Sequence, residues 1–261
     1  MLWETQYDPN APADAFHSLV EAWDDPETKV FVLRAAAPVD DIRAMLEANF
    51  RYLGTPVPLA EDARVADRSK QRTDELWFEV RYDPTVPDAY RHSANAQPLH
   101  TDGSYIPSFP NATLMGCVAN AGEGGETTFI DANDLVSCMR RENPDLLGKL
   151  AEASLPHERS GDRRVERVID SDHRPSLVNW NFYCVADDVD ERQKSLAQAF
   201  FDYLQTSPGV RSHILEVKLA PGDCVTWKDR EVLHGRNGFR ASKESERFIW
   251  KCAIDIGVFG P

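Results

Sequence analysis

Short apolar or alternating runs recur from Leu76 to the end of the chain, separated by turn signals. Runs of this length and spacing are typical of strands in an all-β sandwich or barrel. The predicted strands cover residues 76–82, 113–119, 125–130, 163–169, 176–178, 213–219, 222–227 and 247–256. The hydrophobic pattern therefore predicts a mainly β core in the C-terminal two thirds of the chain.

Helical periodicity is confined to four stretches. These are Pro12–Trp23, Asp40–Phe50 and the stretches near residues 133–153 and 187–205. The first two flank a β-rich run, Val30-Phe31-Val32-Leu33, whereas residues 61–75 are dense in charge and fit a solvated helix or a loop. Because nothing marks a linker, we expect one domain over residues 1–261, with helices packed outside the β core.

The chain is acidic, with 29 basic and 43 acidic side chains and a formal net charge of −14. This charge argues against a general nucleic-acid surface or an anionic-membrane surface. No run approaches the roughly 18 apolar residues that span a bilayer. Met1-Leu2-Trp3-Glu4 also lacks the basic start and apolar stretch of a signal peptide. We therefore expect a small-molecule partner, with no nucleic acid and no membrane; the pattern does not indicate an oligomeric state.

The five cysteines are scattered, odd in number and without a CxxC pair. This spacing favours reduced, mostly buried thiols over a disulfide framework or a thiolate metal site. A cytoplasmic location is the corresponding expectation.

Candidate chemistry begins at Pro98-Leu99-His100-Thr101-Asp102-Gly103. On an extended strand, residues i and i+2 project from the same face, so an imidazole and a carboxylate can converge on one metal ion. His234 supplies a second imidazole, after a turn-like segment that closes an apolar run. Two histidines and one carboxylate form the facial triad of non-haem iron(II) sites. Zinc accepts the same ligand types, so the triad alone leaves the metal open.

Arg247 opens the last apolar run, in which both faces of the predicted strand carry apolar residues. A charged group in such a strand is costly unless it meets an opposite charge. Because a guanidinium binds a carboxylate through two parallel hydrogen bonds, Arg247 suits the distal carboxylate of a dicarboxylic cosubstrate.

A glycine turn, Gly124-Gly125, leads through Glu126 into a strand that starts with Thr127 and Thr128. The glycines permit close backbone approach, and Thr127 offers a neutral hydroxyl to a carboxylate.

Taken in order, these elements resemble the taurine dioxygenase-like branch of the clavaminate synthase-like superfamily. The shared pattern is His-X-Asp, then Gly-Gly-acid-Thr, then a distal His-Gly-Arg, then an arginine in the final strand. Here it reads His100-Thr101-Asp102, Gly124-Gly125-Glu126-Thr127, His234-Gly235-Arg236 and Arg247. The resemblance spans most of the chain, from about Leu99 to Ile254.

The resemblance implies a double-stranded β-helix, or jelly roll, with flanking helices. It also implies that His100, Asp102 and His234 bind Fe(II), and that Arg247 and Thr127 hold the distal carboxylate of 2-oxoglutarate. The implied reaction consumes O2, releases succinate and CO2, and oxidises an unactivated C–H of a small polar metabolite such as an amino acid. Because Asp102 is retained, hydroxylation is favoured over halogenation. Desaturation, ring closure and oxidative cleavage use the same ligands and stay open.

Substrate contacts are expected from Lys251, Tyr105, Asn95 and Asn181. Lys251 lies four residues beyond Arg247, on the same strand face, and relatives often carry a second basic residue at this offset to hold an acidic group of the substrate. We therefore expect an anionic substrate. Arg236 is expected to make a structural ion pair, and residues 157–175 form either an active-site lid or a solvated hairpin.

Two alternatives remain at this stage. One is a cupin-like metal protein of the same fold with different chemistry, and the other is a binding module that has lost activity. Arg247 and Thr127 disfavour both, because neither alternative needs a dicarboxylate clamp.

Overall fold

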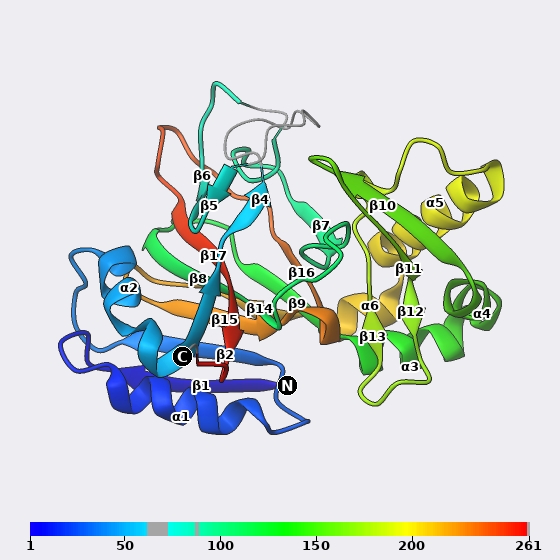
Figure 1. Cartoon of the computed structure of the whole chain (residues 1–261). Coiled ribbons are helices and arrows are strands. Elements are labelled where there is room, and N and C mark those ends of the chain that lie inside the picture. Colours follow the sequence, from blue (N-terminus) through cyan, green and yellow to red (C-terminus); the bar gives the residue numbers. More distant parts are fainter. Residues whose placement is uncertain (62–72, 87–88, 260–261) are drawn as a thin grey trace.

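Two β-sheets packed face to face form the centre of the molecule (Figure 1). The computed structural model describes residues 1–61, 73–86 and 89–259, so most of the charged stretch 61–75 lies outside the described residues. The larger sheet has the strand order β1-β2-β15-β8-β17-β3, and β6 also pairs with β17. Its strands are β1 (Leu2–Tyr7), β2 (Val30–Ala35), β3 (Gly54–Val57), β6 (Phe78–Arg81), β8 (Ala112–Ala119), β15 (Cys224–Lys228) and β17 (Phe248–Ile256). β1 and β2 are parallel, and the other pairs are antiparallel.

The smaller sheet is antiparallel throughout, with the order β14-β9-β16-β7. Its strands are β7 (Gln97–His100), β9 (Thr127–Asp131), β14 (Leu215–Val217) and β16 (Val232–Arg236). Buried side chains of both sheets meet in one apolar cluster, which includes Val32, Met115, Phe129, Val225, Trp227 and Ile249. Burial of this cluster stabilises the pairing of the two sheets, because apolar surface leaves water on both inner faces.

Two N-terminal helices cover the outer face of the larger sheet (Figure 1). They are α1 (Ala13–Trp23) and α2 (Ile42–Leu53). The buried positions of α2, which are Ile42, Leu46, Phe50 and Leu53, recur every three or four residues and form one apolar stripe. The predicted helices Pro12–Trp23 and Asp40–Phe50 are thus confirmed to within a few residues at each end.

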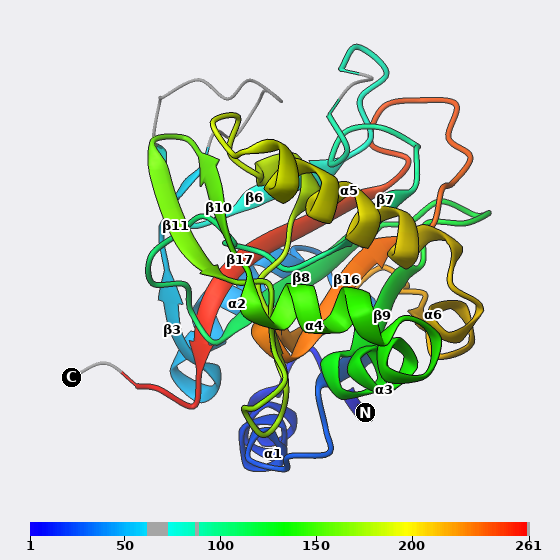
Figure 2. The ribbon, with the colours of Figure 1, turned by 90° about the vertical axis from the view of Figure 1, so that its right-hand side faces the viewer.

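The outer face of the smaller sheet is covered by a second group of helices and hairpins (Figure 2). The helices are α3 (Ala132–Glu142), α4 (Pro144–Glu152), α5 (Glu191–Thr206) and α6 (Pro208–Ser212), with the short 3-10 turn η1 (Phe182–Cys184). The prediction of a single helical stretch near residues 133–153 is wrong in one respect, because these residues form two helices. Asn143 has an extended φ of −153°, ends α3 and caps α4, whose first residue is Pro144.

The remaining strands form small two-stranded sheets. They are β4 (Leu59–Glu61) with β5 (Thr73–Glu75), β10 (Ser154–Arg159) with β11 (Asp162–Arg167), and β12 (Ile169–Asp170) with β13 (Leu177–Val178). The β10–β11 pair is a hairpin that projects beside α5 (Figure 2). No helix within the described ranges is both long enough and apolar enough to cross a bilayer.

Candidate metal centre

The two candidate ligand histidines are direct neighbours across strands of the smaller sheet. His100 is the last residue of β7, and it pairs in register with His234 of β16. Their ring centroids are 4.1 Å apart, and both side chains are buried. Cross-strand pairing therefore explains how two residues far apart in sequence reach one point.

Asp102 reaches the same point from a turn, which corrects the expectation that it shares a strand with His100. The strand β7 ends at His100, and Asp102 follows in a turn whose Gly103 has φ +58°. Its Oδ1 lies 3.8 Å from Nε2 of His100, and its Oδ2 lies 3.6 Å from Nε2 of His234. The potential ligand atoms of the three residues all lie within 4.8 Å of one another. The predicted convergence is present, although its local cause is different.

The protonation states of the three residues suit a divalent cation. Burial lowers the pKa of His100 and that of His234, so both imidazoles are neutral near pH 7. His100 uses Nδ1 to contact the Pro98 carbonyl at 2.9 Å, which leaves Nε2 for a metal. Burial alone would raise the pKa of Asp102, but the Lys251 ammonium and the two histidines hold it well below its usual range. Two neutral imidazoles and one carboxylate are the donor set that iron(II) prefers in facial-triad sites.

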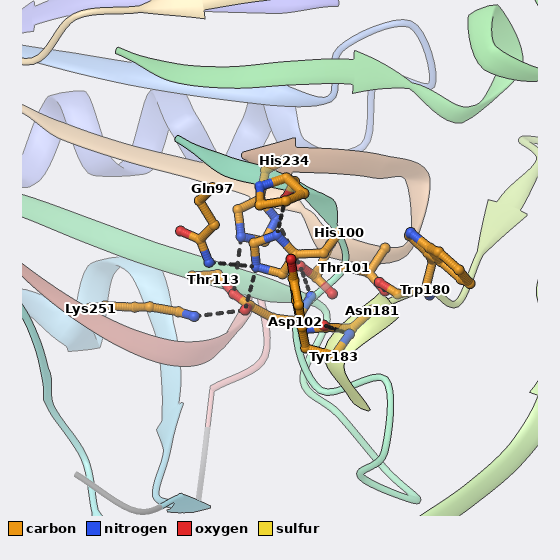
Figure 3. A network of polar contacts seen from close by, with 12 residues as sticks. Gln97, His100, Thr101, Asp102, Thr113, Trp180, Asn181, Tyr183, His234 and Lys251 are labelled. Atoms are coloured by element: carbon orange, nitrogen blue, oxygen red, sulfur yellow. Dashed lines mark hydrogen bonds and ion pairs between the residues drawn. The ribbon is translucent and has the colours of Figure 1, made fainter. Parts of the chain in front are cut away.

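Both carboxylate oxygens of Asp102 accept a hydrogen bond from the larger sheet (Figure 3). Lys251 Nζ of β17 donates to Oδ1 at 2.7 Å, and Thr113 Oγ1 of β8 donates to Oδ2 at 2.9 Å. A third contact holds the backbone, because the N–H of Asp102 donates to Asp229 Oδ1 at 3.0 Å. These contacts fix the orientation of the carboxylate before any ion binds.

Sequence reasoning missed three polar residues beside the ligands. Thr113 and Asp229 contact Asp102, and Gln97 Nε2 lies 3.3 Å from His100 Nε2. Gln97 sits three residues before His100, and Asp229 sits five before His234, so proximity in sequence was the only available signal. Burial, followed by the neighbouring Asp102 carboxylate, raises the pKa of Asp229. A divalent cation held by the ligands would act in the opposite direction, by favouring the ionised form.

Arg247 is a buried cation beside the turn that leads into β9. It directly precedes β17 and is 2% exposed. A Cβ on Gly125 would lie 3.2 Å from the Arg247 Nε, so the glycine makes room for the guanidinium. Burial lowers the pKa of Arg247 to about 10, and its Nε has no hydrogen-bond partner among the described residues. Such a group fits an incoming carboxylate, because an unpaired buried charge is costly.

Thr127 is the first residue of β9 and is buried. It pairs in register with Arg236 of β16, two residues beyond the histidine ligand. Arg236 does not make the expected ion pair with a described residue. Instead, its Nη2 donates to three backbone carbonyls, those of Tyr90, Ser93 and Asn95, and so holds the loop before β7.

A cavity of about 670 Å³ opens onto the three candidate ligands. Its wall includes Asn95, Asn181 and Lys251, three of the four residues expected to contact a substrate. The fourth, Tyr105, is buried and is not part of the wall. Arg247 and Thr127 are not among the residues that line the cavity. Among the described residues, the lining contains three cations, Arg91, Arg159 and Lys251, and one carboxylate, that of Asp102.

The wall opposite the sheets comes from the second group of helices and hairpins. Arg159 of β10 and Asn181 to Tyr183 around η1 line the cavity. Tyr183 Oη contacts Tyr90 Oη at 2.6 Å, which joins this wall to the loop before β7. The stretch 157–175 thus forms strands β10 to β12 and the segment that follows them, and one of its residues reaches the candidate site.

Comparison with known proteins assigns the family. The profile of the "Taurine catabolism dioxygenase TauD, TfdA family" matches residues 6–253. The human gamma-butyrobetaine dioxygenase is 23% identical over 172 residues, which cover 61% of this chain and 44% of the human protein. A Streptomyces uridine-5'-phosphate dioxygenase is 25% identical over 195 residues, which cover 67% of this chain and 70% of that enzyme. The chain therefore spans less than half the length of the first relative and about two thirds of the second.

Solved structures share the fold. An asparagine oxygenase in complex with Fe(II), 3-hydroxyasparagine and succinate superposes with a TM-score of 0.68 at 15% identity, over 94% of this chain and 80% of that one. The non-haem iron oxygenase OrfP, in complex with iron and alpha-ketoglutaric acid, gives 0.67 at 14% identity, over 95% and 81%. These matches confirm a mainly β jelly roll with flanking helices. Since the family profile covers nearly the whole sequence, the chain belongs to the TauD/TfdA family of dioxygenases, whose members use Fe(II), 2-oxoglutarate and O2.

Proposed function

We propose that this protein is an iron(II)- and 2-oxoglutarate-dependent hydroxylase of a small anionic metabolite such as an amino acid, releasing succinate and CO2. The observation that carries the proposal is the buried His100–Asp102–His234 group at the floor of the cavity. Iron(II) with 2-oxoglutarate and O2 supplies the oxidising chemistry when bound. The protein holds the ion, orients the cosubstrate and positions the target C–H.

The ligand residues would hold the ion through Nε2 of His100, Nε2 of His234 and one oxygen of Asp102. With three protein ligands, the ion would remain accessible to the cosubstrate and to O2. The hydrogen bonds from Thr113 and Lys251 restrict rotation of the Asp102 carboxylate, which favours a single coordination geometry.

Arg247 and Thr127 receive the distal carboxylate of 2-oxoglutarate in this proposal. The guanidinium is buried, and its Nε lacks a partner in the described part of the chain. A carboxylate would neutralise the charge and satisfy its donors.

An anionic substrate is supported by the charge of the cavity. Its described wall carries Arg91, Arg159 and Lys251, although the protein as a whole has a net charge of −14. The two curated relatives described above are named for gamma-butyrobetaine and uridine 5'-phosphate, which both carry an anionic group. Asn95 and Asn181 add amides to the same wall and suit a polar metabolite.

Anaerobic spectroscopy tests the proposed function. Addition of Fe(II) and 2-oxoglutarate to the purified protein should give a metal-to-ligand charge-transfer band in the visible, and admission of O2 should release succinate. A metabolite screen for substrate-dependent succinate release would then identify the substrate. Confirmed iron binding without this band would overturn the assignment.

A further inference from the structure

Asp229 is a fully buried carboxylate that contacts two of the three candidate ligand residues from behind. It begins the 3-10 turn η2 (Asp229–Glu231) between β15 and β16, and its side chain is 0% exposed. Its Oδ1 accepts the backbone N–H of Asp102 at 3.0 Å and the indole N–H of Trp227 at 3.2 Å. The same oxygen lies 3.8 Å from Nδ1 of His234. Asp229 is not part of the cavity wall, so a substrate would not reach it.

Two buried polar atoms beside this contact lack a partner among the described residues. They are Nδ1 of His234 and Oδ2 of Asp229. The other ligand histidine differs, because Nδ1 of His100 contacts the Pro98 carbonyl at 2.9 Å. A neutral histidine that binds a metal through Nε2 carries its proton on Nδ1, and this N–H requires an acceptor. In His234, Nε2 faces Asp102 and Nδ1 faces Asp229.

We propose that Asp229 is a positioning residue of the metal centre. It accepts the Nδ1–H of His234 when Nε2 of that ring holds the ion, and it simultaneously fixes the backbone of Asp102. One carboxylate thereby sets the orientation of a ligand on β16 and of a ligand in the turn after β7. This inference rests on the proposed function only in requiring that the three ligands bind a divalent cation.

The three groups that converge on Asp229 are all donors: a backbone N–H, an indole N–H and an imidazole N–H. All three converge on the same oxygen, Oδ1, so the isosteric amide of asparagine could keep its carbonyl oxygen at this position and retain every contact. Leucine has nearly the same shape but no acceptor. It would leave the backbone N–H of Asp102 and the Nδ1–H of His234 without the oxygen that faces them.

The test is Asp229→Leu, compared with Asp223→Leu as a matched control. Asp223 is also buried, and it accepts the backbone N–H groups of Ala35 and Ala220, but it makes no contact with the ligands. Binding of Co(II) or Zn(II) is measured without 2-oxoglutarate or turnover, together with thermal unfolding of the metal-free proteins. Asp229→Leu should weaken metal binding roughly 10- to 100-fold, whereas Asp223→Leu should change it less than about twofold. Unchanged metal affinity in a folded Asp229→Leu variant would overturn the proposal.

A measurement on the unmodified protein covers the case in which Asp229→Leu does not fold. In the Zn(II)-bound protein, the Nδ1–H of His234 should give a downfield imidazole proton signal that exchanges slowly with water. Location of the His234 proton on Nε2 would overturn the proposal. Because neither experiment uses 2-oxoglutarate, a failure of the proposed enzymatic function would be seen separately, as an absent charge-transfer band.

Discussion

At the scale of single residues, the candidate site places two basic side chains of the last strand region in different environments. Arg247 is buried and does not line the cavity, whereas Lys251 lies at the cavity wall and pairs with Asp102. The lysine therefore contacts an internal carboxylate, in addition to the substrate role that its position predicts. An ammonium has three N–H donors, so the Asp102 contact uses one of them.

Replacing Arg247 by glutamine should weaken 2-oxoglutarate binding while leaving metal binding intact. Loss of a buried charge-assisted pair costs about 2–5 kcal/mol, which is a roughly 30- to several-thousand-fold loss of affinity. Anaerobic titration of the Fe(II) protein, followed by the charge-transfer band, measures this affinity. Arg163→Gln is the control, because Arg163 makes only exposed ion pairs with Glu158 and Asp188. An unchanged affinity in Arg247→Gln would show that another group holds the carboxylate.

Replacing Lys251 by methionine separates two roles. If Lys251 holds the substrate anion, substrate affinity should fall roughly 10- to 100-fold, in line with the energy of a hydrogen bond to a charged group, and 2-oxoglutarate affinity should barely change. If its main partner is Asp102, metal affinity should fall instead. Both affinities are measured once a substrate is known, with Lys194→Met, an exposed lysine paired with Glu191, as the control. Unchanged substrate affinity would contradict the predicted substrate role.

At the scale of elements, the β10–β11 hairpin and η1 form one wall of the cavity and share a buried histidine. His157 of β10 is 0% exposed, and its Nε2 lies 3.4 Å from the backbone N of Asn181. Burial lowers the pKa of His157 to about 4. The wall is therefore built around an imidazole that must stay neutral.

This histidine predicts a loss of stability in mild acid. The unfolded chain protonates His157 near pH 6.5, whereas the folded chain does so only near pH 4, so the unfolded state binds more protons between these values. Its contribution to stability is present above pH 6.5 and is lost as the pH falls toward 4. Between pH 7 and pH 5 the loss is about 2 kcal/mol. Urea unfolding at pH 7 and pH 5 measures this loss in the wild-type protein and in His157→Gln. The free energy of unfolding should fall by about 2 kcal/mol less in His157→Gln than in the wild-type protein. Equal declines in the two proteins would contradict the prediction.

Helices and strands with a clear hydrophobic pattern of their own could be predicted from the sequence. Strands whose conformation depends on pairing with other strands could not. Helix α2 has its apolar residues at helical spacing, and β8 is mostly apolar, with Thr113 as its one hydroxyl residue. Strand β7 contains Gln97 and Pro98, and β16 contains Gly235, so neither has an intrinsic strand pattern. Their strand conformation comes from pairing with each other and with β9.

The same distinction applies to the site. The convergence of His100, Asp102 and His234 could be predicted because residue type and order limit their chemistry, whereas the role of Arg247 stays a prediction. Thr113 and Asp229 could not, because threonine and aspartate are common and only the register of β8 and the turn after β15 bring them to Asp102. Such hydrogen-bond partners are set by three-dimensional packing, and no local sequence pattern indicates them.

At the scale of the whole molecule, the apolar interior encloses every cysteine. All five cysteines lie in the described residues, are buried and form no disulfide. Burial raises the pKa of Cys117 to about 12 and raises those of Cys224 and Cys252 further. The thiols are distributed over the larger sheet, α3 and η1, so together they report on the unfolding of the larger sheet and of the helical group that covers the smaller sheet.

Thiol reactivity should therefore follow global unfolding. Native protein at pH 8 should show no rapidly reacting thiol toward a disulfide reagent, because a reactive thiolate requires exposure and an accessible pKa. All five cysteines should react after denaturation in guanidinium chloride. One stoichiometric fast thiol in the native protein would indicate that part of the interior opens independently.

The pairing of His100 with His234 makes any bound ion a cross-link at a sheet edge. Strand β7 is the last strand of the smaller sheet, and an irregularity interrupts its register with β16. An edge strand that pairs with one neighbour in an irregular register opens more easily than a central strand. Amide hydrogen exchange at Leu99 and His100 should therefore slow when Zn(II) is added, while β8, between two neighbours in the larger sheet, should be unaffected. If the exchange rates in β7 did not change on addition of Zn(II), the bound ion would not stabilise this edge strand.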